Sequence, residues 1–515
     1  MAPKKEPDSF LDQTRDQRPS GRFNAWLLGS SVASLASAVY LIRDAKMPAS
    51  HIHLIEARRT PEDALSITGD SVTGYDHRAA CMPSLSDICI EDLLTSVPSA
   101  PNSGKTVMDK ANKGPVPMDI FIQCGRDLEM IDASTFSIGL KVRAQLAVFM
   151  LKPEKSLIRK KINDFFERRF FTSKFWALWS TTFCPWHSAI EFRRCLRRYF
   201  HDFRSLCAFN ALDRCRYIPY EDIIGPLTRF LQNEGVDLRF NSKVTNLKIN
   251  PGHDPRAVSA FKYTQDGTTE SIVNVSSRDI VIVSPGSVMS GSTRGTNSAP
   301  PSLELLDAED NLDGNWSLWL GICPSLGDPY NFCTRVSESR LESFTVTIKG
   351  INFLNFLKHF KEMSKKEAGP SALISLRHSN WFLSVYLPRQ PLFTRQSNDV
   401  NVFWGYGMLP EQEGNFVKKP MVRCSGREIM IELLQHLNVP LEPILDDSIV
   451  IPRLTPRLTA PLLSRSGSDR SVIIPEKFDN LAAIGQFVEL PNETSATMDY
   501  SVRGAKSAVY QLMRL

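Results

Sequence analysis

The sequence predicts an α/β protein in which a parallel sheet is interrupted by inserted segments. The first observation behind this prediction is a strand–turn–helix–strand unit between Asn24 and Glu56. The second is a pair of later apolar runs, Asp279–Val283 and Leu481–Ile484, that are typical of buried strands. The third is a helix expected over Asp499–Leu512, which closes the chain after the last of these strands. Together they predict one sheet assembled from distant parts of the sequence.

The first unit predicts strands at Ala25–Leu28 and His51–Ile55 and a helix rich in small residues at Val32–Ile42. This order is typical of the βαβ unit of a Rossmann-like dinucleotide-binding domain. There, backbone N–H groups at the helix start hold a pyrophosphate. The acid that ends the second strand, here Glu56, binds the ribose hydroxyls in such domains.

The turn of this unit departs from the G-x-G-x-x-G fingerprint, because it reads Gly29, Ser31 and Ser34 at the three glycine positions. The middle glycine normally lets the backbone approach the phosphates, and Ser31 places a Cβ there. We predict Gly29, Ser31, Ser34 and Glu56 as cofactor-binding residues. The alternative is a βαβ unit that has kept its packing and lost its ligand.

Length and composition narrow the class of protein. The 515 residues can form two or three domains, and 42% hydrophobic with 23% charged residues is ordinary for a globular protein. A net charge of +5 does not argue for a nucleic-acid partner. Ten cysteines without a C-x-x-C pair indicate reduced thiols in a cytoplasmic protein and no metal site. Residues 1–22 are polar and lack a signal peptide, and no apolar run is long enough to span a bilayer.

The middle of the chain predicts a helical segment followed by strands. A short helix is expected around 88–94, a strand at 120–122, and mostly helix over 136–209. Two stretches there, 151–171 and 191–204, interleave basic and aromatic residues. Such stretches can lie on an anionic membrane surface. The alternative is a solvated face over packed aromatic residues.

The remaining elements complete a domain scheme. Strands are expected at 237–240, 243–249, 257–263, 343–348, 371–376, 381–387 and 400–407, and helices at 222–232 and 426–437. We expect a disordered tail at 1–22 and the first part of the dinucleotide domain at 23–135. A helical substrate-side segment at 136–235 and a return to the dinucleotide domain at 236–290 follow. An α+β substrate-binding domain at 291–450 and the C-terminal part of the dinucleotide domain at 451–515 complete the chain.

Several long stretches carry a resemblance to one family. Ala33–Asp44, Pro185–Arg194, Phe403–Pro420 and Gly485–Ala505 resemble segments of the oleate hydratases, also called myosin-cross-reactive antigen proteins. The resemblance runs from about Ala25 to the C-terminus. It implies a flavoprotein fold and addition of water to an isolated double bond of a fatty acid, with a carboxylic acid as proton donor. It also implies FAD as a candidate cofactor at Gly485 and Gln486 as well as at the first turn. Homodimers are common in the family.

The chain departs from the family where the chemistry should lie. The resemblance places Met82 at the proton-donating glutamate, Cys195 at a tyrosine that helps to activate water, and Tyr217-Ile218-Pro219-Tyr220 at a substrate-lining Tyr-Asn-Gln-Tyr segment. Residues that hold the fatty-acid carboxylate correspond to Tyr386, Pro388 and Leu392. Two acids, Glu62 and Asp63, replace glycines of a flavin-side segment and would repel a pyrophosphate.

Three functional hypotheses follow. The first is an enzyme repurposed for isomerisation, cyclisation or a pericyclic step on a large apolar unsaturated molecule, as in secondary metabolism, where orientation alone lowers the barrier. The second is a FAD-dependent hydratase whose donor is displaced to Asp76, Asp87 or Glu91. The third is a non-catalytic lipid-binding homologue. Candidate catalytic residues are Met82, Cys195, Tyr217, Tyr220 and His187, and Pro219, Tyr386, Pro388 and Leu392 are the candidate substrate-binding residues.

Two of these residues have a purely structural alternative. His187 could simply be a satisfied core histidine, and Cys195 could be a small apolar residue or a thiol activated by Arg194 and Arg197.

Overall fold

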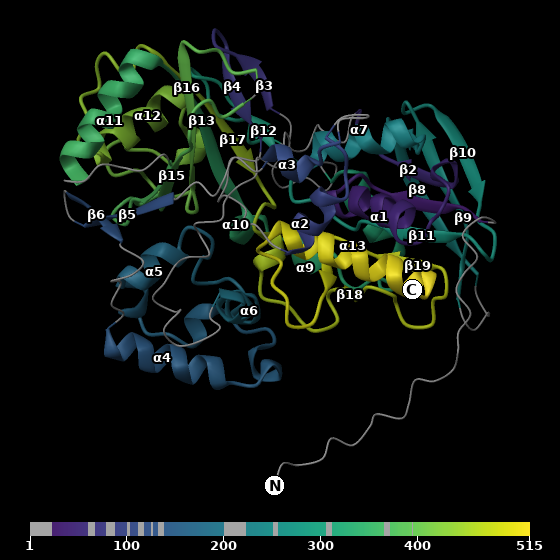
Figure 1. Ribbon diagram of the computed structural model, residues 1–515. Coiled ribbons are helices and arrows are strands. Elements are labelled where there is room, and N and C mark those ends of the chain that lie inside the picture. Colours follow the sequence, from purple (N-terminus) through teal and green to yellow (C-terminus); the bar gives the residue numbers. More distant parts are fainter. Residues whose placement is uncertain are drawn as a thin grey trace.

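A computed structural model describes the chain at residues 23–59, 67–78, 88–99, 104–111, 118–124, 127–131, 139–199, 223–250, 256–304, 312–364, 371–393 and 395–515. Figure 1 shows a sheet-and-helix body that contains both β11 and the C-terminal helix α13, a second sheet beside it, and a helical unit below that second sheet. Met82, Tyr217, Pro219 and Tyr220 lie outside the described residues, as do the segment Pro61–Leu65 and Asp87.

The first body is built on a five-stranded parallel sheet, as predicted. Its order is β19 (Leu481–Ala483), β11 (Ile280–Val283), β1 (Ala25–Leu28), β2 (Ile52–Ile55) and β7 (Asp237–Arg239). All four neighbouring pairs run parallel. Every residue of β1 and β11 is buried, which explains why both strands read as continuous apolar runs rather than alternating ones. The Rossmann-like fold class is therefore confirmed.

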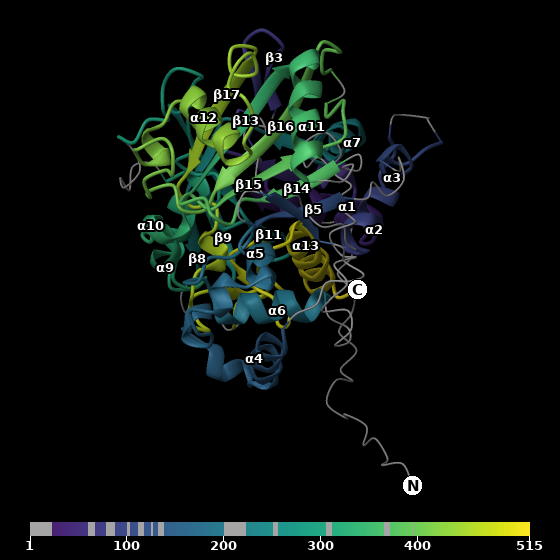
Figure 2. The same cartoon turned by 90° about the vertical axis from the view of Figure 1, so that its left-hand side faces the viewer.

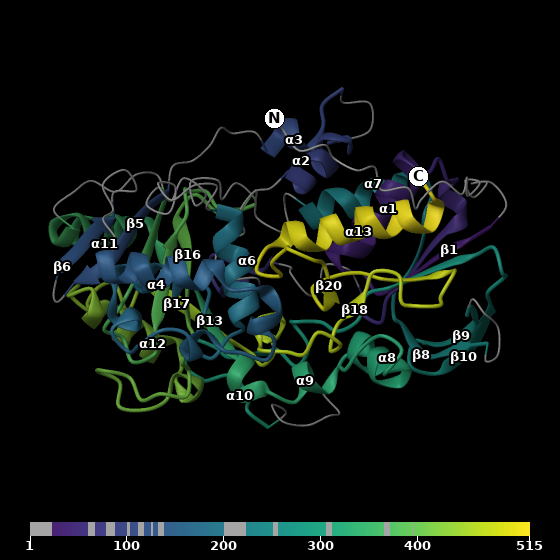
Figure 3. The same ribbon diagram turned by 90° about the horizontal axis from the view of Figure 1, so that it is seen from below.

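Small residues position the helix that follows β1. Helix α1 (Val32–Arg43) buries three alanines and two serines on its way from Ala33 to Ala38. Their short side chains let α1 pack closely against helix α13 (Met498–Met513), and α7 (Gly225–Glu234) contacts it as well. Figure 3 shows these three helices together on one side of the body, with the antiparallel sheet β8 (Ser242–Ile249), β9 (Val258–Gln265) and β10 (Thr269–Asn274) on the other.

The second sheet has eight strands and a mixed order. The order is β12 (Thr293–Arg294), β17 (Ser448–Thr455), β13 (Leu341–Lys349), β16 (Val400–Gly407), β15 (Leu383–Leu387), β14 (Ser371–Ser375), β5 (Met118–Cys124) and β6 (Asp127–Ile131). Only β14 and β5 pair in parallel. Figure 2 shows α11 (Gly350–Ser364) and α12 (Gly426–His436) covering one face of this sheet.

The helical unit covers another part of the second sheet. It contains α4 (Leu140–Leu151), α5 (Lys174–Trp179) and α6 (Ala189–Tyr199), joined by short 3-10 turns. Aromatic rings fill its interior, and the rings of Phe166 and Phe170 stack with their centroids 3.9 Å apart. The same apolar cluster continues into β14, β15 and β16. The segment is therefore a packed layer against the sheet, not a separate bundle.

A buried ion network joins the helical unit to the C-terminal part of the chain. Glu191 of α6 lies 3.0 Å from Arg465 and 3.2 Å from Arg470, and Arg465 also pairs with Glu489 at 2.6 Å. Burial opposes ionisation, yet Arg465 and Arg194 hold the pKa of Glu489 down at about 2. The network therefore stays charged at neutral pH and fixes α6 against the first body.

Several elements were not predicted from the sequence. The hairpin of β3 (Ile67–Asp70) and β4 (Gly74–His77), strand β17, helix α11 and helix α8 (Gly314–Ile322) are additions. The short strand β12, at the edge of the second sheet, is a further addition. The hairpin depends on tertiary contact, since the Tyr75 N–H donates to the Thr347 hydroxyl of β13 at 2.8 Å. Within the described residues, no helix is long and apolar enough to cross a bilayer.

Strand β13 carries a fully buried acid, Glu342. Neither of its carboxylate oxygens has a hydrogen-bond partner among the described residues. Burial, with the charge of Glu411 as a smaller cause, raises the pKa of Glu342 well above its usual range. The folded protein therefore holds Glu342 in its neutral, protonated form.

We predict that Glu342→Gln reduces the loss of stability as pH rises. The pKa of Glu342 is higher in the folded than in the unfolded protein. Glu342 therefore costs no stability below its unfolded pKa of about 4.5, and it lowers the free energy of unfolding increasingly as pH rises towards its folded pKa. Urea unfolding at pH 5 and pH 8 measures this. A wild-type free energy that falls with pH no more than that of the variant would contradict it.

Candidate functional site

The turn after β1 is closed by the chain itself. Gly29 has a φ of +100°, and its N–H donates to the Ile55 carbonyl at 2.9 Å. A Cβ added at Gly29 would lie only 2.9 Å from Oδ1 of Asn315, at the start of α8. The space beside the turn that the missing side chain of Gly29 leaves is therefore filled by the Asn315 side chain.

Glu56 is likewise occupied from within the chain. It is 2% exposed. Its Oε2 accepts from the Ser30 N–H at 2.6 Å and from the Ser30 hydroxyl, and its Oε1 accepts from the Arg58 N–H at 2.9 Å. The carboxylate predicted to hold ribose hydroxyls thus ties the ends of β1 and β2 together.

Serine side chains fill the start of helix α1. The Ser31 hydroxyl accepts from the Ser34 N–H at 3.3 Å and from the Ser284 hydroxyl at 2.8 Å. Gly485 has a φ of +98°, and a Cβ there would lie 3.4 Å from the Ser284 hydroxyl oxygen. Gln486 donates from Nε2 to the Ser495 carbonyl at 3.5 Å. The structure therefore gathers Gly29, Ser31, Ser34, Glu56 and Gly485 at one edge of the parallel sheet, with Gln486 next to them in the chain.

The segment Asp313–Trp316 lies across this edge. Arg58, after β2, donates to Asp313 at 2.8 Å and to the Ser287 hydroxyl at 2.7 Å. The Trp316 indole N–H donates to the Ser287 carbonyl, after β11, at 2.9 Å. Loops that follow β1, β2 and β11 are all in contact with the start of α8. A dinucleotide does not fit this edge of the sheet unless Asp313–Trp316 moves away.

A second candidate site lies where the eight-stranded sheet meets the helical unit. The rings of Tyr386 and Trp404 have centroids 4.6 Å apart, and Leu392 and Phe393 belong to the same buried cluster. Pro388 is buried directly after β15, which ends at Leu387. The structure thus brings the described substrate-binding candidates onto one apolar wall. We call Tyr386, Leu392, Phe393, Trp404 and His77 the aromatic wall.

His77 of β4 is the polar member of the aromatic wall. Its ring centroid is 4.9 Å from that of Trp404 and 6.0 Å from that of Phe393. Burial lowers the pKa of His77 to about 4, so the imidazole is neutral at pH 7. Its Nδ1 is buried and has no hydrogen-bond partner among the described residues. A neutral imidazole against apolar rings can accept or donate one proton.

The acids proposed as displaced donors are placed elsewhere. Asp76 is buried and its carboxylate is bound by Arg453, with Nε 3.3 Å from Oδ1, while Arg294 lies 3.6 Å away. Glu91 lies on α2 (Ile88–Thr95), which packs against α13 of the first body. Neither carboxyl group is presented to the aromatic wall as a free acid.

Cys195 and His187 are core residues of the helical unit. Burial raises the pKa of the Cys195 thiol, and this corrects the idea that arginines activate it. Arg194 turns instead to Glu489 at 2.7 Å. His187 is fully buried, its Nδ1 accepts from the Cys184 N–H at 3.0 Å, and burial lowers its pKa to about 3. Both side chains are neutral at pH 7.

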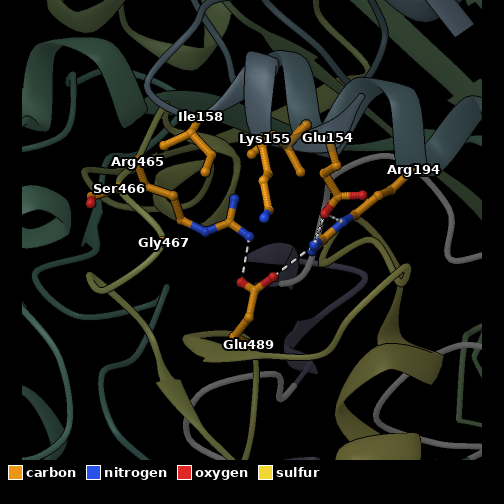
Figure 4. Close-up of a pocket in the computed structure, with 9 residues that line it drawn as sticks. Glu154, Lys155, Ile158, Arg194, Arg465, Ser466, Gly467 and Glu489 are labelled. Carbon is orange, nitrogen blue, oxygen red and sulfur yellow. Dashed lines mark hydrogen bonds and ion pairs between the residues drawn. The ribbon is translucent and has the colours of Figure 1, made fainter. Parts of the chain in front are cut away.

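A pocket of about 210 Å³ lies beside the ion network (Figure 4). Figure 4 shows Arg465, Glu489, Arg194 and Glu154 linked in a chain by ion pairs and hydrogen bonds. Because these charges already satisfy one another, the pocket does not offer the apolar surroundings that an alkene needs. Within the described residues, no group of three or more His, Cys, Asp or Glu side chains could hold a metal ion.

Sequence reasoning missed two residues at these sites. Asn315 follows Asp313, which caps α8 by accepting from the Asn315 and Trp316 N–H groups at 3.1 and 3.2 Å. That cap was a usable signal for a helix start, but nothing local indicates where the helix packs. His77 ends a fully buried strand, and a histidine in an unassigned polar stretch carries no such signal.

Comparisons with known proteins agree with this architecture. The model of the MCRA family matches residues 22–510. The oleate hydratase of Streptococcus pyogenes serotype M49 (strain NZ131) is 30% identical, over 96% of this chain and 86% of its own length. The linoleate hydratase of Lactiplantibacillus plantarum is 28% identical, over 94% of this chain and 93% of its own. A solved oxidoreductase from Methanosarcina mazei shares the fold with a TM-score of 0.53 at 10% identity, covering 94% of this chain and 99% of that one.

We predict that Glu56→Ala destabilises the protein by roughly 3 kcal/mol in the absence of any nucleotide, because it leaves charge-assisted hydrogen bonds from Ser30 and Arg58 unmade. Glu56→Gln, which keeps one acceptor oxygen, should lose less. Thermal unfolding of the nucleotide-free proteins measures this. Equal stability of Glu56→Ala and wild type would show that the carboxylate has no structural role.

We predict that His77→Phe reduces acid destabilisation. The folded pKa of about 4 lies below the unfolded value of about 6.5, so the unfolded chain binds the proton first and stability falls as pH drops from about 6.5 to about 4. At pH 5 His77 lowers the free energy of unfolding by about 2 kcal/mol. His187, whose pKa is also lowered by burial, still destabilises the variant in acid. Unfolding curves at pH 7 and pH 5 that shift equally in both proteins would contradict the prediction.

Proposed function

The chain belongs to the MCRA family, and from that premise we propose an enzyme that acts without net redox change on a large apolar unsaturated substrate. The family match confirms the resemblance to the oleate hydratases, and a hydratase-like protein is the broad assignment it supports. Our finer proposal is that the reaction is an isomerisation, a cyclisation or a pericyclic step.

The observation that carries this proposal is the chemistry of the aromatic wall. Its described members are aromatic rings and an aliphatic side chain, and their polar atoms are the neutral imidazole of His77, the Tyr386 hydroxyl and the Trp404 indole N–H. Addition of water to an isolated alkene needs a strong, placed acid. Asp76, next to His77 in the chain, is instead bound by Arg453. These surroundings favour a reaction controlled by the fold of the substrate.

The residues of the wall would act by holding and orienting the substrate. Tyr386, Trp404 and Phe393 present ring faces and edges to a hydrocarbon chain, which fixes its conformation and keeps water out. In a cyclisation or a pericyclic step the bonds rearrange within the substrate, so His77 would act by orienting the substrate and would take no proton from it. No atom is added to the substrate or lost from it.

Two alternatives stand beside this proposal. The two relatives, an oleate hydratase and a linoleate hydratase, favour a FAD-dependent hydratase of fatty-acid double bonds. In that case Gly29, Ser31, Ser34, Glu56, Gly485 and Gln486 would face the cofactor after Asp313–Trp316 has moved, and FAD would organise the site. The buried, mutually satisfied core of the helical unit would also suit a non-catalytic lipid carrier.

We predict that purified protein without FAD converts a polyene into a product of unchanged mass, and that His77→Phe lowers the rate at least tenfold, since misplacing a substrate by about 1 Å can cost on the order of a hundredfold. Incubation with oleate, linoleate and a terpenoid polyene, followed by mass spectrometry and chromatography, measures it. His378 is an exposed histidine between β14 and β15. The variant His378→Phe is therefore the matched control and should keep the wild-type rate.

Each other outcome points to one alternative. A product heavier by one water that forms from oleate or linoleate only with FAD would replace our proposal with the hydratase. Bound lipid without turnover of any substrate would identify a carrier.

A further inference from the structure

Helix α4 carries apolar side chains on both its inner and its outer face, although it lies on the outside of the molecule (Figures 1 and 3). Its inner face buries Leu146 and Phe149 in the cluster shared with the second sheet. Its outer face carries Leu140, Val148 and Leu151, which are 83, 60 and 85% exposed. Leu140, Ala144, Val148 and Leu151 follow one another at helical spacing, so they form a continuous exposed stripe. A helix with apolar side chains on both faces normally has both faces covered.

The surroundings of this stripe are strongly basic. Residues 139–174 carry ten Lys and Arg against three Asp and Glu, a net charge of +7, whereas the whole chain carries +5. Lys155, Arg159 and Lys160 are exposed just beyond the end of α4, beside Ile158, which is 37% exposed. None of these three cations forms an ion pair with a described residue. Figure 4 shows Lys155 and Ile158 together at the pocket next to α4.

We propose that the face formed by α4 and residues 152–160 docks on an anionic lipid membrane. The stripe would lie in the plane of the interface with its apolar side chains below the headgroups, and the cations would meet lipid phosphates. A helix of twelve residues is too short to span a bilayer but long enough for this position.

Charge decides between a membrane and a second copy of the chain. A twofold dimer through α4 would place two basic faces against each other, each with six Lys and Arg and one Glu over residues 139–160, which is unfavourable. An anionic bilayer instead complements that charge and also accepts the apolar stripe. The inference goes beyond the proposed function, because it concerns where the protein works and holds whether or not the protein catalyses a reaction.

The test is flotation of the full-length protein with vesicles of phosphatidylcholine alone and of equimolar phosphatidylglycerol and phosphatidylcholine. We expect wild type to float with the anionic vesicles only, and to dissociate as salt is raised. Val148→Glu/Leu151→Glu should weaken binding more than about tenfold. Both side chains are exposed, so the fold should survive, which circular dichroism checks.

The matched control is Ile351→Glu/Leu354→Glu on α11, a second exposed apolar pair at the same spacing, 66 and 61% exposed. It should float like wild type. Absence of wild-type binding, or equal weakening in both double variants, would overturn the proposal. A third result would also overturn it. If light scattering shows that wild type is a dimer, and Val148→Glu/Leu151→Glu makes it a monomer without changing vesicle binding, then α4 is an interface between two copies of the chain.

Discussion

The contact between Asn315 and Gly29 determines what the parallel sheet can bind. A glycine with positive φ leaves the turn after β1 open to close approach, and here Asn315 takes that space. The contact is supported from below, because Trp316 and Phe487 pack with ring centroids 4.9 Å apart and Gly286 leaves room for the Phe487 ring. Arg58, Asp313 and Ser287 hold the same segment from the side. Moving the segment Asp313–Trp316 away would therefore break its contacts with the loops after β1, β2 and β11.

Closure at this edge places the chemistry elsewhere. The polar groups of the first body satisfy one another, as Glu56 does with Ser30 and Arg58. His77 is one of the buried polar groups without a described partner, and its ring lies against the aromatic wall. The ion network around Glu191 holds the helical unit against the first body. We propose that the aromatic wall selects one conformation of a flexible hydrocarbon.

The first body was largely predictable because its signals are local. Continuous burial of β1, small residues in α1 and the acid at Glu56 all leave direct traces in the sequence. The hairpin β3–β4 is held by hydrogen bonds to Thr345 and Thr347, more than 260 residues later, so no local pattern announces it. The same holds for the sites. Gly29 and Glu56 were identified by spacing, but whether they face a ligand or Asn315 depends on a helix that lies 286 positions after Gly29.

The visible absorption spectrum of the purified protein, recorded after incubation with FAD and desalting, tests the central claim most directly. With Asn315 on Gly29, wild type should retain no flavin band, and Asn315→Gly, which removes the covering side chain, should retain more than wild type. Stoichiometric flavin in wild type would contradict the account. The start of α8 would then be a mobile cover, and the sheet edge would be a working cofactor site.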